Sequence, residues 1–139
     1  MHHVFRVEHS VTRLGPFQTN EPFTQMLAGK AIARPELKSP GEDGLPLGHI
    51  PFSFVFGCVG LGNLQQWFLL GDACSDNKEI VDRLGLLGFR VGEYLVDDED
   101  CWVSDSGIQA AFHAAHAREE GLVTYHHVGI LISKQPSLA

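Results

Sequence analysis

The sequence predicts an α+β fold: a single compact domain with about four or five mostly antiparallel strands packed with about three helices. The length of 139 residues suits one domain. Hydrophobic residues make up 44% of the chain and charged residues 19%, so a core can be buried. Short runs with the period of a strand alternate with runs that have the period of a helix. No apolar run approaches the roughly 18 residues that span a membrane.

Residues 4–8 form the first expected strand. Its alternation directs Phe5 and Val7 to one face and Arg6 and Glu8 to the other. An arginine in the middle of a strand needs an anion or a carboxylate partner. Arg6 is therefore either half of an ion pair with Glu8 or a residue that holds the phosphates of a nucleotide.

A helix, a loop and an aromatic strand follow. Pro22 suits the first position of a helix, and Gly29 suits its end. Residues 34–48 hold three prolines and three glycines, which predicts a long loop that is functional or mobile. Residues 51–57 then predict a strand. One face of this strand carries Phe52, Phe54 and Phe56. We expect that face to lie in the core.

The middle of the chain predicts two helices and a strand. Asn63 is a suitable N-cap for residues 63–70, and Ser75 is one for residues 75–87. Phe89–Val96 alternates as a strand does, and an acidic turn follows it. We expect the side chain of Trp102 to pack in the core.

The last third of the chain is open to two interpretations at residues 107–120. The apolar residues and alanines of residues 107–120 suit a helix, but a short strand at 108–112 that leads into a helix fits equally well. Residues 122–132 are rich in β-branched and aromatic types and predict the closing strand. Residues 133–139 predict a flexible tail.

The charge argues for a basic partner. Ten basic and 17 acidic residues give a formal charge of −7. Nucleic-acid binders normally carry a basic stripe, so direct binding of nucleic acid is not expected. Four acidic side chains gather in the turn after the strand, and we predict that they bind a basic protein surface: Asp97, Asp98, Glu99 and Asp100. A homodimer whose aromatic surfaces pair is a further alternative.

Cysteines and histidines are the other candidates for chemistry. Three cysteines without a CxxC pair, and a start without a signal pattern, predict a reducing cytoplasm. Cys58 precedes a helix that could lower its pKa, but its apolar neighbours favour inert packing. His113 and His116 would face alike on a helix, with His126 or His127 approaching from the last strand. No HExxH pattern occurs, so we predict no metal site.

Several stretches resemble small proteins carried by phages and prophages. They are FRVEHSVTRLGPF, GEDGLPLGHIPFSFVFGCVGLGNLQQWF, and LGFRVGEYLV with GIQAAFH further on. The resemblance implies a protein that acts in the cytoplasm of a bacterial host cell. It also implies, as for anti-CRISPR proteins, that the chain binds and inhibits a host or defence protein complex without a cofactor.

The order of elements also resembles a reduced mono-ADP-ribosyltransferase. This resemblance implies NAD as cofactor, Arg6 as the residue that holds it, and Ser53 as the serine of the middle strand. Gln109 stands where such enzymes carry a glutamate, and it lacks the charge that stabilises an oxocarbenium ion. An enzyme that modifies a host protein is thus the alternative function, with an aromatic pocket from Phe52, Phe54 and Tyr94.

Overall fold

The computed structural model describes residues 1–32, 34, 37–68, 75–125 and 131–133. The strands are β1 (His2–His9), β2 (Phe54–Val59), β3 (Phe89–Val96), β4 (Cys101–Val103), β5 (Gln109–His113), β6 (Arg118–Tyr125) and β7 (Leu131–Ser133). The α-helices are α1 (Pro22–Ile32), α2 (Leu61–Phe68) and α3 (Ser75–Leu86), and the 3₁₀ turns are η1 (Pro16–Gln18), η2 (Leu47–His49) and η3 (Asp98–Asp100).

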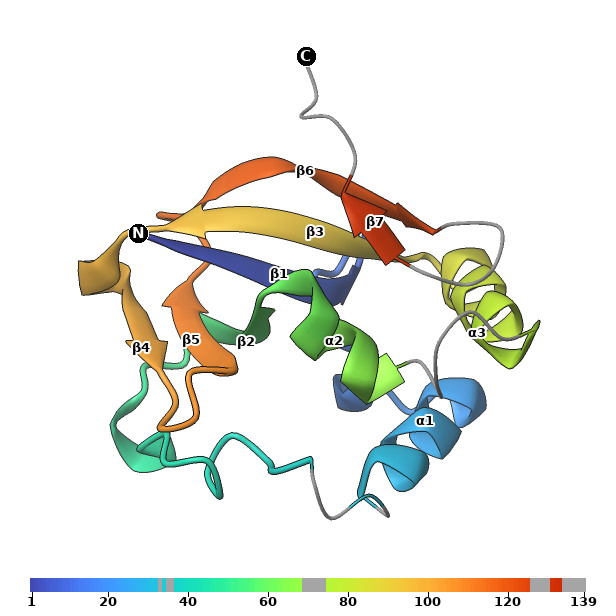
Figure 1. Cartoon of the computed structure of the whole chain (residues 1–139), viewed down its shortest axis with the longest axis horizontal. Coiled ribbons are helices and arrows are strands. Elements are labelled where there is room, and N and C mark those ends of the chain that lie inside the picture. The colour runs from blue at the N-terminus through green and yellow to red at the C-terminus, as the bar shows by residue number, and fades with distance from the viewer. Residues whose placement is uncertain (33, 35–36, 69–74, 126–130, 134–139) are drawn as a thin grey trace.

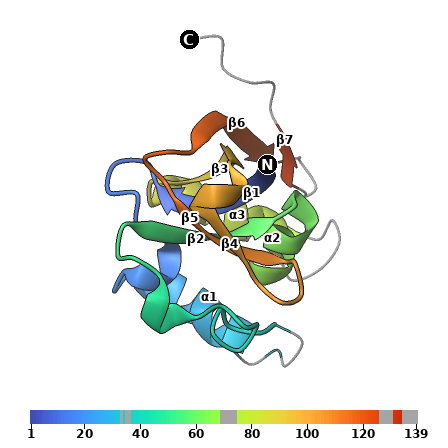
Figure 2. The ribbon, with the colours of Figure 1, turned by 90° about the vertical axis from the view of Figure 1, so that its left-hand side faces the viewer.

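All described strands belong to one antiparallel sheet with the order β4-β5-β2-β1-β3-β6-β7 (Figure 1). The predicted α+β single domain is confirmed, with seven strands in place of four or five. Figure 2 shows α1 and the teal segment that follows it at one end of the molecule, below β2, β4 and β5, and the sheet strands β6 and β7 at the other end.

The central strand β1 directs Phe5 and Val7 to one face, as its alternation predicts, and it is buried on both of its faces. On one face, Phe5 and Val7 pack with residues of all three α-helices. These helical partners are Leu27, Leu64, Ile80 and Leu84. On the other face, Val4 packs with Val96 and Phe112, and none of these three side chains is accessible to solvent. The helices therefore cover one face, and side chains of the sheet itself fill the other.

The pairing of β1 is unequal on its two sides. All eight residues of β1 pair with β3, from His2↔Val96 to His9↔Phe89. The register with β2 has only two pairs, Val4↔Val59 and Phe5↔Cys58. Beyond Phe5 the two strands diverge, and side chains occupy the space between them.

Both interpretations of residues 107–120 included a helix, and that helix is wrong. This stretch forms β5, a turn and the start of β6, so the short strand expected at 108–112 is confirmed. Alanine favours helices by intrinsic propensity, but Ala110 and Ala111 are fully buried on strand β5, between β4 and β2, where larger side chains would not fit. Tertiary packing thus overrides local propensity.

Other expected boundaries also differ. α1 continues past Gly29, and α2 begins at Leu61, so Asn63 lies inside α2 and its Nδ2 donates to the Val59 carbonyl at 2.6 Å. β2 begins only at Phe54, which leaves the side chain of Phe52 fully exposed instead of in the core.

The expected closing strand, residues 122–132, falls partly outside the described residues. Its described parts form the end of β6 and most of β7. Residues 126–130, with His126 and His127, and residues 134–139 of the predicted tail lie outside the description.

Asp43 fastens the segment before β2 to the turn between β4 and β5. Its Oδ1 accepts from the Ser106 backbone N–H at 3.1 Å, and its Oδ2 accepts from Ser106 Oγ at 2.6 Å and from Gln109 Nε2 at 3.3 Å. The Asp43 carbonyl accepts from the Asp105 N–H at 2.8 Å. Although burial opposes the charge, these donors together hold the pKa of Asp43 below its ordinary value.

Replacement of Asp43 by asparagine is expected to lower stability in a pH-dependent way. The loss at neutral pH should be about 1–3 kcal/mol, because donors in a buried site lose a charged acceptor. Folding lowers the pKa of Asp43, so its carboxylate stabilises wild type fully at pH values above the ordinary aspartate pKa. The stability difference between wild type and Asp43→Asn therefore shrinks as the pH falls below about 4. Urea unfolding across pH measures it, with Asp105→Asn as an exposed control. A difference that does not change with pH would contradict the account.

Gly57 is a second sensitive point, because a Cβ there would lie 2.6 Å from Val4 Cγ1 and 2.8 Å from the Phe5 carbonyl oxygen. Gly57→Ala is expected to lower the free energy of unfolding by about 2–3 kcal/mol through overpacking. In the matched control Gly85→Ala, within α3, a Cβ meets nothing within 4 Å, and stability should rise by about 0.5–1 kcal/mol. Equal effects of the two substitutions in denaturant titrations would show that close packing at Gly57 is not needed.

Candidate functional site

The guanidinium of Arg6 binds oxygen atoms of three segments. Arg6 lies on β1 with 6% of its surface exposed. Its Nη1 donates to the Phe56 carbonyl at 2.6 Å, and its Nη2 donates to the Arg13 carbonyl at 3.0 Å and to Gln18 Oε1 at 3.4 Å. Arg6 thus bridges the gap where β1 and β2 diverge and fixes the segment from Arg13 to η1.

Glu8 provides the carboxylate that Arg6 was expected to need. Its side chain is on the same face, and its Oε2 lies 3.8 Å from Arg6 Nε. Tyr94 donates its hydroxyl hydrogen to Glu8 Oε1, and Arg13 Nη1 lies 3.3 Å from the same oxygen. Burial and the bond to Glu8 raise the pKa of Tyr94, and burial lowers the pKa of Arg6. The expected ion pair is therefore present within a larger buried network.

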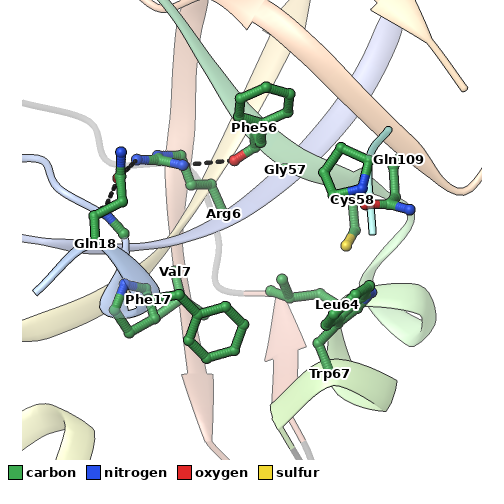
Figure 3. A pocket seen from close by; sticks show the side chains of 13 residues that line it. Arg6, Val7, Phe17, Gln18, Phe56, Gly57, Cys58, Leu64, Trp67 and Gln109 are labelled. Carbon is green, nitrogen blue, oxygen red and sulfur yellow. Dashed lines mark hydrogen bonds between the residues drawn. The ribbon is translucent and has the colours of Figure 1, made fainter. Parts of the chain in front are cut away.

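An open cavity of about 230 Å³ lies beside Arg6, between the sheet, η1 and α2. Figure 3 shows Arg6 and Gln18 on one side of it and Gln109 and Trp67 on the other. The described residues that line it are Arg6, Val7, Gly15, Pro16, Phe17, Gln18, Pro40, Phe56, Gly57, Cys58, Leu64, Trp67 and Gln109. Most of these side chains are apolar.

The structure brings together two of the three residues expected for NAD chemistry. Arg6 and Gln109 line the same cavity, whereas Ser53 lies exposed in the turn before β2 and is not among the described lining residues. The aromatic pocket expected beside them is wrong. Phe52 is exposed, and the ring of Tyr94 packs against Phe112, with 5.4 Å between ring centroids, and is not among the described lining residues of the cavity.

The acidic turn forms η3 between β3 and β4, with Asp97 at its N-cap. One carboxylate oxygen from each of Asp97, Glu99 and Asp100 lies within 4.8 Å of the others. The side chain of Asp98 is 75% exposed and accepts from the Met1 amine at 2.7 Å. This hydrogen bond raises the pKa of the Met1 amine and lowers the pKa of Asp98. The turn therefore presents a group of acidic side chains, most of them exposed to solvent.

Two exposed apolar side chains directly follow the acidic turn. Trp102 and Val103 lie on the edge strand β4, and each is 39% exposed. The expectation that Trp102 packs in the core is wrong, because β4 has only three residues and a partner strand on one side. Trp102 stands two residues after four consecutive acidic residues, and this position could have indicated from the sequence that its side chain is exposed.

Two histidines lie near the same corner. His113 and His116 are in β5 and the turn after it instead of on a helix, and their rings stack with 3.9 Å between centroids. His116 Nδ1 lies 3.2 Å from Asp100 Oδ1. The turn after β5 is thereby connected to the acidic turn.

The cysteines show no sign of activation among the described residues. Burial raises the pKa of the Cys58 thiol to about 12 and is the largest cause that raises the pKa of Cys101, to about 11. The suggestion that a helix lowers the pKa of Cys58 is therefore wrong, and inert packing describes this thiol. Cys74 lies outside the described residues.

A comparison with models of protein families gives a match over most of the chain. Residues 1–126 match the family described as "Bacteriophage T4 Y00F protein". No curated protein and no solved structure matches the chain. None of the helices in the described part is long and apolar enough to cross a membrane. The match covers most of the 139 residues, and the chain belongs to the Bacteriophage T4 Y00F protein family.

Proposed function

We propose that this phage-family protein binds a basic surface of a host or defence protein complex and inhibits it. A CRISPR effector complex is one target of this kind, because its nucleic-acid channel is positively charged. The observation that carries the proposal is the acidic-aromatic patch, defined as Asp97, Asp98, Glu99, Asp100, Trp102 and Val103. It joins a group of acidic side chains to an exposed tryptophan at one edge of the sheet.

The charge of the patch supports a basic partner. Four acids against one N-terminal amine give −4 + 1 = −3 at this corner, in a chain of net charge −7. A concentrated charge of this kind speeds the encounter with a positive surface, and the attraction weakens as salt is added. The acidic side chains thus favour association with a basic partner and orient the protein on the partner's surface.

Trp102 supports binding of a protein instead of a small cation. Tryptophan is enriched among the few interface residues that contribute most to affinity, and such residues lie inside a ring of weaker polar contacts. Trp102 and Val103 provide the apolar centre, and the acids provide the polar rim.

An NAD-binding enzyme of the ADP-ribosyltransferase type is the second candidate. The shared cavity of Arg6 and Gln109 favours it. However, three N–H groups of Arg6 already bind protein oxygens, and the cavity of about 230 Å³ is below the common range of about 300–1,000 Å³ for ligand sites. It is small for a dinucleotide, so this candidate ranks second.

Two substitutions within the patch are expected to weaken target binding. A target is first captured from bacterial lysate and identified by mass spectrometry, and its affinity is then measured by calorimetry. Glu99→Lys should weaken binding about tenfold, and Trp102→Ala about 30-fold or more, because one reverses a rim charge and the other removes the apolar anchor. The control Glu79→Lys makes the same charge change at an exposed site on α3 and should have little effect.

The inhibitory role is tested by plaque counts on bacteria that carry the identified defence complex. Wild type and Glu79→Lys should restore plaques, whereas Trp102→Ala should not. If Glu79→Lys weakens binding as much as Glu99→Lys does, the attraction comes from total charge and not from the patch. If all variants bind the target but none changes plaque counts, inhibition is refuted.

A further inference from the structure

The cavity beside Arg6 has one cationic end. No acidic side chain is among its described lining residues. The carboxylate nearest to Arg6, Glu8, is 3.8 Å from Nε and also contacts Arg13 and Tyr94. A guanidinium has five N–H groups, and the hydrogen bonds described for Arg6 use three of them. Arg6 therefore has positive charge and donor capacity that the described part of the protein does not fully use.

Gln18 adds a donor at the same end. Its Oε1 accepts from the Gly15 N–H at 2.7 Å and from Arg6 Nη2 at 3.4 Å, which directs the amide oxygen inward. Its Nε2 has no hydrogen bond to another described residue, and the side chain is exposed. An anion at this end would thus meet a guanidinium and an amide N–H.

The opposite end of the cavity is formed by Gln109, a neutral side chain. Gln109 Nε2 donates to the Lys38 carbonyl at 2.8 Å and to Asp43 Oδ2 at 3.3 Å, so protein oxygens already use its N–H groups. A smaller cavity of about 140 Å³ shares Trp67 and Gln109 with the first and is lined by both Asp43 and Lys38. Arg6 is the one charged side chain among the described lining residues of the larger cavity, and it therefore fixes the direction of a bound anion.

We propose that this cavity binds a small aromatic carboxylate, with its ring against Trp67 and Leu64 and its carboxylate toward Arg6 and Gln18. The walls between the two ends are apolar and include the aromatic side chains of Phe17 and Trp67. An apolar cavity of roughly 150 Å³ accepts a benzene ring, so about 230 Å³ suits one fused bicyclic ring. This site is separate from the acidic-aromatic patch, and neither proposal depends on the other.

Calorimetry with indole-3-carboxylate tests the proposal, and indole-3-carboxamide serves as the uncharged analogue of the same shape. We expect the carboxylate to bind with a dissociation constant below about 1 mM and the carboxamide to bind about tenfold more weakly. No saturable binding of the carboxylate, or equal affinity for the two compounds, would overturn the proposal.

Two substitutions separate the contact with the ring from the contact with the charge. A Cβ at Gly15 would lie 3.2 Å from Gln18 Oε1 and 3.6 and 3.7 Å from Arg6 Nη2 and Nη1, so Gly15→Ala places a methyl group against both groups proposed to hold the carboxylate. Gly15→Ala should weaken the carboxylate about tenfold and the carboxamide much less. Trp67→Ala should weaken both compounds equally. The control Gly48→Ala, where a Cβ meets nothing within 4 Å, should weaken neither.

Circular dichroism and heteronuclear NMR spectra establish that each variant is folded before its affinity is compared. Unchanged affinity of folded Gly15→Ala and Trp67→Ala for the carboxylate would place the ligand elsewhere and refute the site.

Discussion

The buried guanidinium of Arg6 is the contact on which the centre of this structure depends. The β1–β2 register has only two residue pairs, and past them Arg6 connects β1 to the Phe56 carbonyl of β2. It also binds the Arg13 carbonyl and so holds the segment before η1 against the sheet. Burial of this charge is costly, and Glu8 and three oxygen acceptors offset the cost. The same arrangement leaves a cavity next to the guanidinium.

The protein separates two surfaces of opposite charge along one sheet. The acidic-aromatic patch lies at the edge strand β4 (Figure 1) and the turn before it, whereas the cavity lies beside the central strand β1, between the sheet, η1 and α2 (Figure 3). The patch suits a basic macromolecule, and the cavity suits a small anion. This separation allows either site to be altered while the other is kept, which makes the two proposals independent in experiments.

The sequence predicts those features that depend on neighbouring residues. The alternation of Phe5 and Val7 against Arg6, the strand Phe89–Val96 and the acidic turn all follow from local patterns. The choice of a strand over a helix at residues 107–120, and the cavity, do not follow from local patterns, because they depend on contacts between distant segments. Ala111 is in a strand because β2 and β4 flank it, and the Arg6–Phe56 bond joins residues that are 50 positions apart. No local pattern contains such contacts.

The most direct test of the central network is a double-mutant cycle on the free energy of unfolding, with Arg6→Met, Glu8→Leu and the double variant. Each single substitution is predicted to cost about 3–5 kcal/mol, because Glu8→Leu removes the carboxylate beside the buried guanidinium, and Arg6→Met removes one of the two cations beside Glu8 together with the hydrogen bonds of the guanidinium. The double variant should cost about 1–3 kcal/mol less than the sum of the two. The exposed pair Arg118–Glu120, whose atoms lie 3.0 Å apart, is the control and should couple by less than about 1 kcal/mol. Additivity of the Arg6 and Glu8 effects within about 0.5 kcal/mol would contradict the account.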